Sequence, residues 1–246
     1  MKLPMLNNPS MWTGLLLNAL LTAGASSSTM VSLSVEESFD PNPIVANRSA
    51  AVGGGNTIAG CASLGIGFGN QQLNGYCTVL IGEFNLAETC YSGLTVGSYN
   101  RTNGFYNINA GADNSVWGSA NFVMGSMNEI NEDPLSGWSG CNGVFGQYNS
   151  TTNGVNCLIV GENNELKNPT ADSAAIGHGL ILDSGATSQI VVGQYNEHGT
   201  AIANARFVVA NGTAANSPSN AFIVYANGDV RIPKRQGDIQ MGEFGF

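Results

Sequence analysis

A five-residue motif, apolar-Gly-x-x-Asn, recurs along most of this chain and constrains its fold more than any other feature. Complete copies begin at Val52, Ile66, Ile81, Val96, Ala110, Met124, Phe145, Val160 and Val192, and a copy at Ile176 lacks the final Asn. Apart from one insertion, Ile130 to Trp138, successive copies start about 14 to 16 residues apart, half the period of a helical hairpin repeat. The spacing therefore predicts a repeat protein built from short β-coils.

Each repeat can hold two strands of about four residues and two tight turns, which is one coil of a flattened parallel β-solenoid. We expect the apolar residue to end a strand pointing inward and the Asn to tolerate a left-handed backbone and stack on the next Asn. A half-step copy at Trp117 and Asn-Gly pairs such as Asn103-Gly104 predict the second turn. The glycines allow positive φ or close backbone contact at the first turn, and they are Gly53, Gly67, Gly82, Gly97, Gly125, Gly146, Gly161, Gly177 and Gly193.

The composition favours such coils over a layered enzyme core, with 33 glycines and only 10% charged residues. A thin coil encloses a file of small apolar side chains, yet aromatic residues such as Phe84 and Tyr99 lie inside the motif. Further copies of the chain are the simplest cover for them, because parallel solenoids can pack in register around a rotation axis. We therefore expect a homotrimer.

Charge and cysteine content exclude other classes. The formal net charge of -9 argues against nucleic-acid binding, which requires a basic surface. Cysteines occur at Cys61, Cys77, Cys90, Cys141 and Cys157. Their odd number and the lack of a Cys-x-x-Cys pair indicate neither a disulfide framework nor a zinc site, so we expect buried free thiols inside the coils.

The apolar run from Trp12 to Ala25 has two interpretations. Residues 1–30 can form a short anchor helix capped by Ser10. Alternatively, Lys2, the apolar run and the small residues at its end are typical of a secretory signal peptide. The run is too short to span a membrane. The face expected to make the anchor contact consists of Trp12, Leu15, Leu16 and Ala19.

The other boundaries follow from shifts in pattern. Residues 31–47 are interpreted as a neck strand and linker, because Val31, Leu33 and Val35 alternate with polar residues and prolines follow. Residues 48–206 hold the repeats. Residues 207–232 contain longer apolar strands expected to cap the open end, and residues 233–246 form a tail.

The repeats resemble the left-handed parallel β-roll in the heads of trimeric autotransporter adhesins and in bacteriophage fibre and head-fibre proteins. The segments Phe207 to Thr213, Ser219 to Tyr225 and Asn227 to Val230 are similar to the one that ends such rolls in phage tail fibres. The resemblance covers about residues 50 to 232 and implies a left-handed homotrimer. The sequence shows no long heptad stalk and no C-terminal membrane strands, which favours a virion protein docked on capsid or tail through its N-terminal segment.

The functional expectation is a non-enzymatic fibre or spike that decorates the capsid or tail of a bacteriophage virion. The alternative is a secreted bacterial trimeric adhesin or surface-layer component, which requires the signal peptide. Turn residues could bind host-cell surface glycans through many weak contacts, or could instead pack in the trimer and the ladders. These residues are Tyr99, Tyr148, Tyr195, Gln147 and Gln194.

The sequence contains no recognisable catalytic constellation. Solenoid acyltransferases use a six-residue repeat and an intersubunit histidine, whereas the step here is not a multiple of six. His178 and His198 are expected to be exposed turn residues, and Glu129, Glu132 and Asp133 lack the spacing of a cation site. We therefore expect no enzyme activity, no metal and no cofactor.

Overall fold

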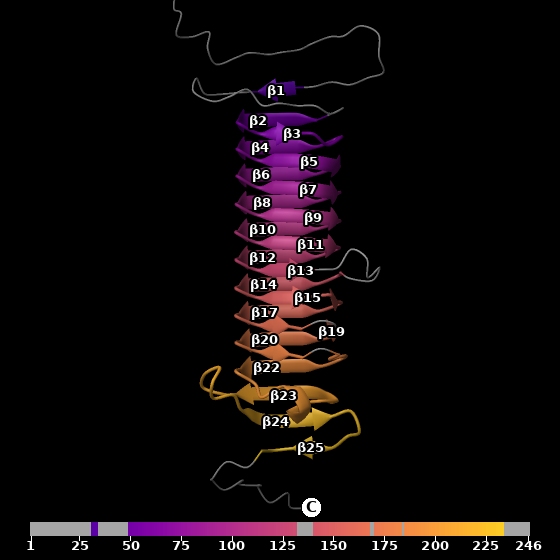
Figure 1. Ribbon diagram of the computed structural model, residues 1–246, viewed down its shortest axis with the longest axis vertical. Helices are drawn as coiled ribbons and strands as arrows, with labels where there is room; N and C mark the ends of the chain where they lie inside the picture. Colours follow the sequence, from indigo (N-terminus) through magenta and orange to yellow (C-terminus); the bar gives the residue numbers. More distant parts are fainter. Residues whose placement is uncertain (1–30, 34–48, 132–139, 168–169, 184, 234–246) are drawn as a thin grey trace, which may run out of the picture.

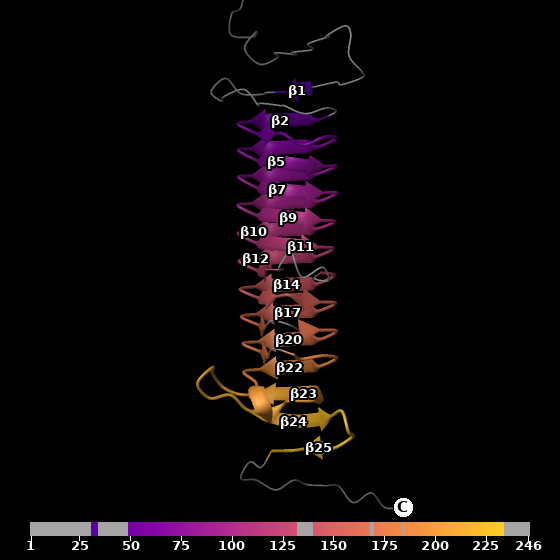
Figure 2. The same ribbon diagram turned by 45° about the vertical axis from the view of Figure 1, so that its right-hand side comes forward.

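The chain is a rod of stacked strands, seen in a computed structural model that describes residues 31–33, 49–131, 140–167, 170–183 and 185–233 (Figure 1). A turned view shows the same single column, with the closing strands at its C-terminal end (Figure 2). Among the described residues the one helical element is η2, a 3-10 turn at Gly199–Ala201. The expected all-β parallel solenoid is confirmed.

Two sheets build the rod, and each coil contributes one strand to each of them. Sheet A has the order β1 (Val31–Leu33), β2 (Ala50–Gly54), β4 (Leu64–Phe68), β6 (Val79–Glu83), β8 (Leu94–Ser98), β10 (Ile108–Ala112), β12 (Phe122–Ser126), β14 (Gly143–Gln147), β17 (Leu158–Glu162), β20 (Ala174–His178), β22 (Ile190–Gln194), β23 (Ala205–Asn211), β24 (Asn220–Tyr225) and β25 (Val230–Arg231). Sheet B has the order β21 (Ile181–Leu182), β18 (Glu165–Leu166), β15 (Ser150–Thr152), β13 (Glu129–Asn131), β11 (Ser115–Ser119), β9 (Arg101–Phe105), β7 (Leu86–Tyr91), β5 (Gln71–Tyr76) and β3 (Thr57–Ile58). A short pair, β16 (Gly154–Val155) and β19 (Thr170–Ala171), extends sheet B.

The glycines of the motif lie in register along sheet A. From β2 to β22 each one pairs with the glycine of the next coil, in an unbroken parallel series that includes Gly111. Gly97 shows why no larger residue fits, because its φ is 115° and an added Cβ would lie 1.9 Å from the Gly111 carbonyl oxygen. Ten coils at about 4.8 Å per strand give a column roughly 45 Å long.

Asparagine side chains form a continuous hydrogen-bonded ladder inside the turn from sheet A to sheet B. The Asn100 amide nitrogen donates to Asn85 Oδ1 at 3.0 Å and to the Gly111 carbonyl at 2.8 Å. Its own Oδ1 accepts from the backbone nitrogen and the amide of Asn114, at 3.1 and 3.0 Å. The left-handed residue is the one before the asparagine, for example Tyr99 with φ 56°, so the expectation that Asn itself takes this conformation is wrong.

A second ladder occupies the opposite turn in the middle of the rod. Asn121 bonds to Asn107, Asn142 bonds to Asn121, and the Asn142 oxygen accepts from the backbone of Cys157. Gly118 pairs with Gly104 in sheet B. The half-step copy at Trp117 is therefore the sheet B half of a coil, and in these coils the repeat unit is half a coil.

The apolar residue of the motif faces outward, which corrects the expectation that it points into the coil. Leu80 is fully buried, whereas the motif residue Ile81 beside it is not. The same alternation of buried and outward-facing residues holds at Val123 and Met124, which are 0% and 45% exposed. Because side chains alternate along a strand, burying the residue before the motif turns the motif residue to the outer face.

The core has two apolar clusters with a polar layer between them, and isolated polar side chains such as Gln72 are also buried. One cluster, which includes Ile58 and Leu80, lies towards the N-terminal end, and a longer one runs from Val116 to the closing strands. Between them the Thr95 and Thr102 hydroxyls are 2.8 Å apart, and the Asn109 amide donates to Thr102 at 3.1 Å.

The parallel series ends at the C-terminal strands expected from the sequence. Strand β23 pairs in parallel with β22, but β24 pairs antiparallel with β23, and β25 antiparallel with β24. At the other end β1 pairs in parallel with β2. The reversal at β24 interrupts the stacking direction, as a cap on a repeat array must.

Candidate functional site

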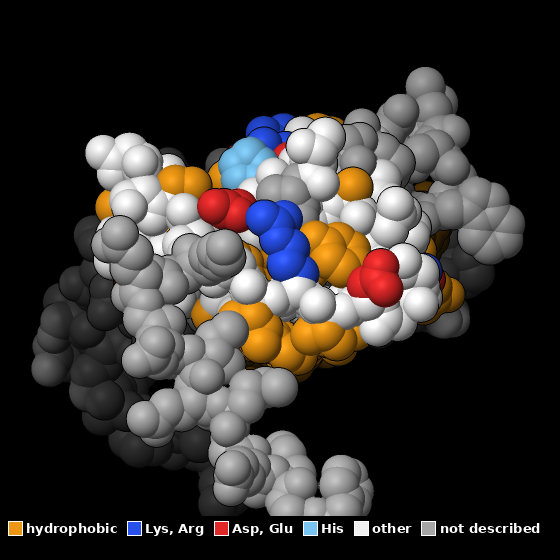
Figure 3. Space-filling view, turned by 90° about the horizontal axis from the view of Figure 1, so that it is seen from below, with side chains coloured by type: hydrophobic (Ala, Val, Ile, Leu, Met, Phe, Trp, Pro, Cys, Tyr) orange, Lys and Arg blue, Asp and Glu red, His pale blue; other side chains and the backbone are white. Residues whose placement is uncertain are grey.

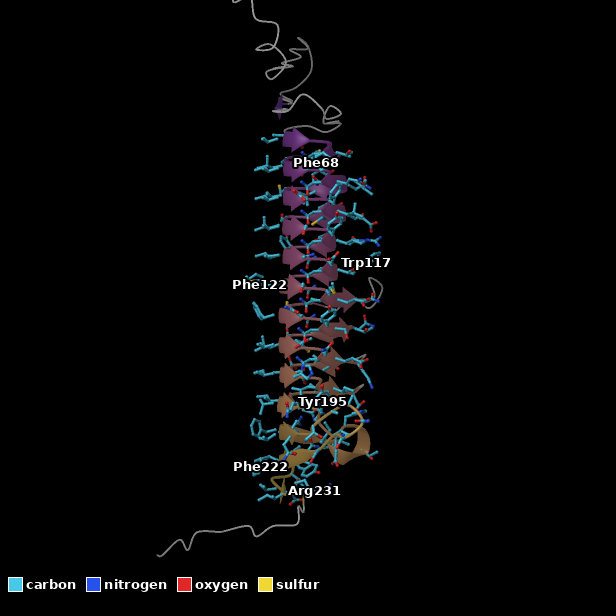
Figure 4. The ribbon with its side chains drawn as sticks, turned by 90° about the vertical axis from the view of Figure 1, so that its left-hand side faces the viewer. Phe68, Trp117, Phe122, Tyr195, Phe222 and Arg231 are labelled. Carbon is cyan, nitrogen blue, oxygen red and sulfur yellow. The ribbon has the colours of Figure 1, made fainter. Side chains whose placement is uncertain are left out.

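The outer face of sheet A carries an uninterrupted apolar stripe. In Figure 4 the side chains on this face, including the labelled Phe122, are free of nitrogen and oxygen atoms. Six of them are exposed by 39 to 45%. The end-on view in Figure 3 shows hydrophobic side chains gathered along the lower edge. The apolar stripe consists of Leu64, Ile66, Val79, Ile81, Leu94, Val96, Ile108, Ala110, Phe122, Met124, Phe145, Leu158, Val160, Ala174, Ile176, Ile190 and Val192.

The outer face of sheet B is mostly polar, with Leu73 as an exposed apolar exception. The labelled Trp117 lies on this opposite side in Figure 4, among side chains that end in nitrogen or oxygen. The Arg101 guanidinium lies 5.0 Å from the Trp117 ring centre and bonds to Glu88 at 2.6 Å. A partly exposed indole flanked by a cation and a carboxylate can contact polar, ring-shaped ligands.

Aromatic side chains contact one another along both turns of the N-terminal coils, stacked in three pairs and edge-on between Phe68 and Phe84. Corner 1, the turn from sheet A to sheet B, carries a ladder in which Phe84 lies 5.3 Å from Phe68 and 5.2 Å from Tyr99. Corner 2, the turn from sheet B to sheet A, carries the ladder Tyr76, Tyr91 and Phe105, with ring centres 5.4 and 4.9 Å apart. Such pairs exceed the stabilisation expected from burial alone by about 0.5–1.5 kcal/mol each.

The five residues predicted to bind glycans all lie on corner 1 but do not form one site. Tyr99, Tyr148 and Tyr195 occupy the same left-handed position in coils three apart, which is about 14 Å. Gln147 and Gln194 each immediately precede one of these tyrosines. Sequence reasoning missed the Phe84–Tyr99 stack, although aromatic residues at one position of successive copies were its signal.

Both histidines pair with acidic or phenolic groups, but only His198 is an exposed turn residue as expected. His178 ends strand β20 and is partly buried. His178 Nε2 lies 2.6 Å from the Tyr195 hydroxyl, and its Nδ1 lies 3.6 Å from Glu162. His198 Nδ1 lies 3.1 Å from Asp183. Within the described ranges no three His, Cys, Asp or Glu side chains gather as metal ligands. Residues Glu132 and Asp133 lie outside those ranges.

A cleft of about 420 Å³ lies where the last coils meet the closing strands. Its charged groups are already engaged. Asp183 bonds to His198 and lies 3.6 Å from Lys167 Nζ, while Arg206 donates to the Thr187 carbonyl at 2.6 Å. The cleft therefore presents little free charge to a ligand.

The cysteines are free thiols, but only two are buried. Cys90 and Cys157 pack inside the coils, and burial raises the pKa of both thiols. Cys77 and Cys141 are exposed, which corrects the expectation that all five are buried. Both adopt positive φ at corner 2, where the side chain points out of the coil.

The expected anchor residues Trp12, Leu15, Leu16 and Ala19 lie outside the described residues. In the part of the chain that the structure describes, no helix has the length and apolarity needed to cross a bilayer. Fold and surfaces define a class, the parallel β-solenoids with one apolar and one polar outer face. Comparison with protein-family models, with curated proteins and with solved structures finds no match in any of the three.

Proposed function

We propose that this chain is a non-enzymatic structural protein of a bacteriophage virion, a homotrimeric fibre or spike mounted on the capsid or tail. The apolar stripe is the observation that carries this proposal. It is about 45 Å long and two side-chain rows wide, on the order of 450 Å². Apolar patches larger than a few hundred Å² mark interaction surfaces on soluble proteins.

Further copies of the same chain are the proposed cover for the stripe. Its side chains repeat with the rung spacing of the coil, and a second copy offers apolar rows with the same spacing. A left-handed winding and a mount formed by the N-terminal residues 1–30 belong to the same proposal, and both rest on the resemblance of the repeats to phage β-rolls.

Sheet B would then be the outer surface of the spike. Its proposed role is weak contact with host-cell surface glycans, multiplied by three copies per spike and many spikes per particle. Trp117 with Arg101 supplies an indole and a cation on this face. A Trp117→Ala variant should lose cell or glycan-array binding while keeping its oligomeric mass. Unchanged binding would contradict this role for the face.

Two measurements test the proposal as a whole. Light scattering of the full chain should give the mass of three copies, and the mass of one copy would refute self-association. Mass spectrometry of gradient-purified phage particles should detect peptides of this chain. Their presence only in a bacterial cell-surface fraction would instead favour the secreted adhesin or surface-layer component.

A further inference from the structure

The aromatic ladders occupy opposite corners of the rod at the same heights. Strand β6 lies between Cys77 at corner 2 and Phe84 at corner 1, and Tyr76 lies next to Cys77. Strand β8 likewise has Tyr91 before its start and Tyr99 after its end. In one chain the strand separates the two ladders, so they cannot touch each other.

These rings are unusually accessible for aromatic side chains. Tyr76 and Tyr99 are 53% and 59% exposed, and Phe84 and Phe105 are 43% and 48% exposed. Contacts within each ladder therefore leave a large part of these rings exposed to water. Exposed rings at both ends of the same strands indicate a partner that meets both corners at one height.

A ring of three copies provides such a partner. A five-residue strand of sheet A is about 17 Å long, so three strands forming a triangle lie about 5 Å from its centre. That distance is half of the roughly 10 Å at which two sheets pack face to face. One layer of side chains from each apolar stripe would therefore fill the interior. At each vertex, corner 1 of one copy meets corner 2 of the next.

We propose that the two aromatic corners are the two halves of one intersubunit seam, which fixes the register of neighbouring copies. The inference rests on the self-association proposed above and adds the contact that closes the ring. A cyclic assembly requires such an interface, in which two different surfaces of one chain meet. Interlocking rings of about equal height would resist sliding by one coil, which the uniform apolar stripe alone would tolerate.

The chain already contains an exposed cysteine through which this seam can be tested by crosslinking. Cys141 is exposed at corner 2, and Tyr148 lies at the other end of the same strand, β14. Within one chain they are seven residues apart along extended backbone, about 23 Å. A disulfide needs Cα atoms within about 7 Å. A bond between these two positions can therefore form only between copies. The left-handed backbone at Tyr148 accepts a cysteine, because Cys77 and Cys141 have similar φ at the left-handed position of the opposite corner.

The test is oxidation of a full-length Tyr148→Cys variant, followed by non-reducing electrophoresis and light scattering. We expect the monomer band to be replaced by covalent dimer and trimer, with nothing larger. Adding Cys141→Ser should abolish the bands. A Thr152→Cys control on the polar face of sheet B should stay monomeric on the gel. Phe84→Cys should crosslink to Cys77 across the seam at β6.

Each contrary result has a separate meaning. Trimeric mass without a crosslink in either variant would overturn the seam and leave the trimer standing. Covalent dimer without covalent trimer on the gel would overturn the threefold arrangement. Monomeric mass of the unsubstituted chain would overturn both the seam and the proposed self-association.

Discussion

Removing one asparagine from the ladder should cost several kcal/mol. An Asn100→Ala substitution deletes three donated and two accepted side-chain hydrogen bonds, those to Asn85, Val96, Gly111 and Asn114. Each bond contributes about 1 kcal/mol net, and an orphaned buried group costs about 1–3 kcal/mol. Because the backbone nitrogen of Asn114 is among the groups left unpaired, we expect a total loss of about 3–5 kcal/mol.

The assay is thermal unfolding followed by circular dichroism at fixed chain concentration. For a chain of this size the loss corresponds to a fall in Tm of roughly 6–20 °C. Hydrogen exchange supplies a local check, since the Asn114 amide should lose its protection first. Asn74→Ala is the matched control, because Asn74 is exposed on a sheet B strand. It should shift stability by less than about 0.5 kcal/mol.

An Asn100→Asp variant separates the hydrogen-bond donor role of the Asn100 amide from the shape of its side chain. Asn100→Asp keeps both acceptor functions but cannot donate to Asn85 or Gly111 while it is ionised. We expect a loss at neutral pH at least as large as that of Asn100→Ala, and partial recovery on acidification, when the carboxyl regains a proton. Equal melting temperatures for Asn100→Ala and Asn74→Ala would refute the ladder as a source of stability.

Three further predictions concern the stripe, the thiols and the polar layer. Met124→Lys should reduce the oligomer to a monomer in light scattering, whereas Asn131→Lys on the outer face of sheet B should not; equal masses would contradict the assigned faces. Cys77 and Cys141 should react with a thiol reagent in the folded protein, and Cys90 and Cys157 only on unfolding. Because the pKa of these two thiols is raised on folding, their contribution to stability should fade as the pH rises above the ordinary thiol pKa, about 8.5, and Cys90→Ala with Cys157→Ala should flatten that decline. Replacing Thr95, Thr102 and Asn109 together with Val should leave Tm unchanged or raise it, because no polar group of the layer is then left unpaired; a large fall would mean that the layer stabilises the coils.

The spacing of the motif was sufficient to predict the fold. A position such as Gly97 tolerates no side chain. The asparagine three residues later must hydrogen-bond to the equivalent asparagines of the adjacent coils. Both requirements fix the same period, so few other folds could satisfy them. The seven-residue half-coil was also visible in the sequence, since Gly104 and Gly118 lie midway between the sheet A glycines.

The direction of the motif residue could not be predicted in the same way. Leu80 and Ile81 are both apolar, as are Val191 and Val192, so hydrophobicity does not distinguish the two faces of sheet A. In the coils that contain Thr95 and Asn109, the hydrophobic pattern predicts that the outer face of sheet A is the buried one, which is wrong. These polar residues lie inside because Thr95 and Asn109 both hydrogen-bond to Thr102 on the facing strand.

The cysteines and aromatics show a second limit of the sequence. The turns place Cys77 and Cys141 in a left-handed conformation outside the coil, while Cys157 enters it one residue after such a turn. A shift of one residue thus separates an exposed thiol from a buried one. Likewise, Tyr91 and Tyr99 lie only eight residues apart, but the strand between them sends them to opposite corners.

The two sheets differ in how much of their surface remains available for function. Sheet A is apolar on its outer face and, apart from Thr95 and Asn109, on its inner face. Its inner residues therefore stabilise the coil, and its outer residues can be shielded from water only by another molecule. Sheet B is mostly apolar inside, where Gln72, Thr102 and Thr151 are the polar exceptions, and mostly polar outside, so it needs less cover. If the stripe is buried between copies, substitutions such as Met124→Lys act on assembly, whereas substitutions at Trp117 or Asn131 act on what the assembled rod contacts. The alternation of side chains along each strand thereby divides one repeat into positions for folding, for assembly and for recognition.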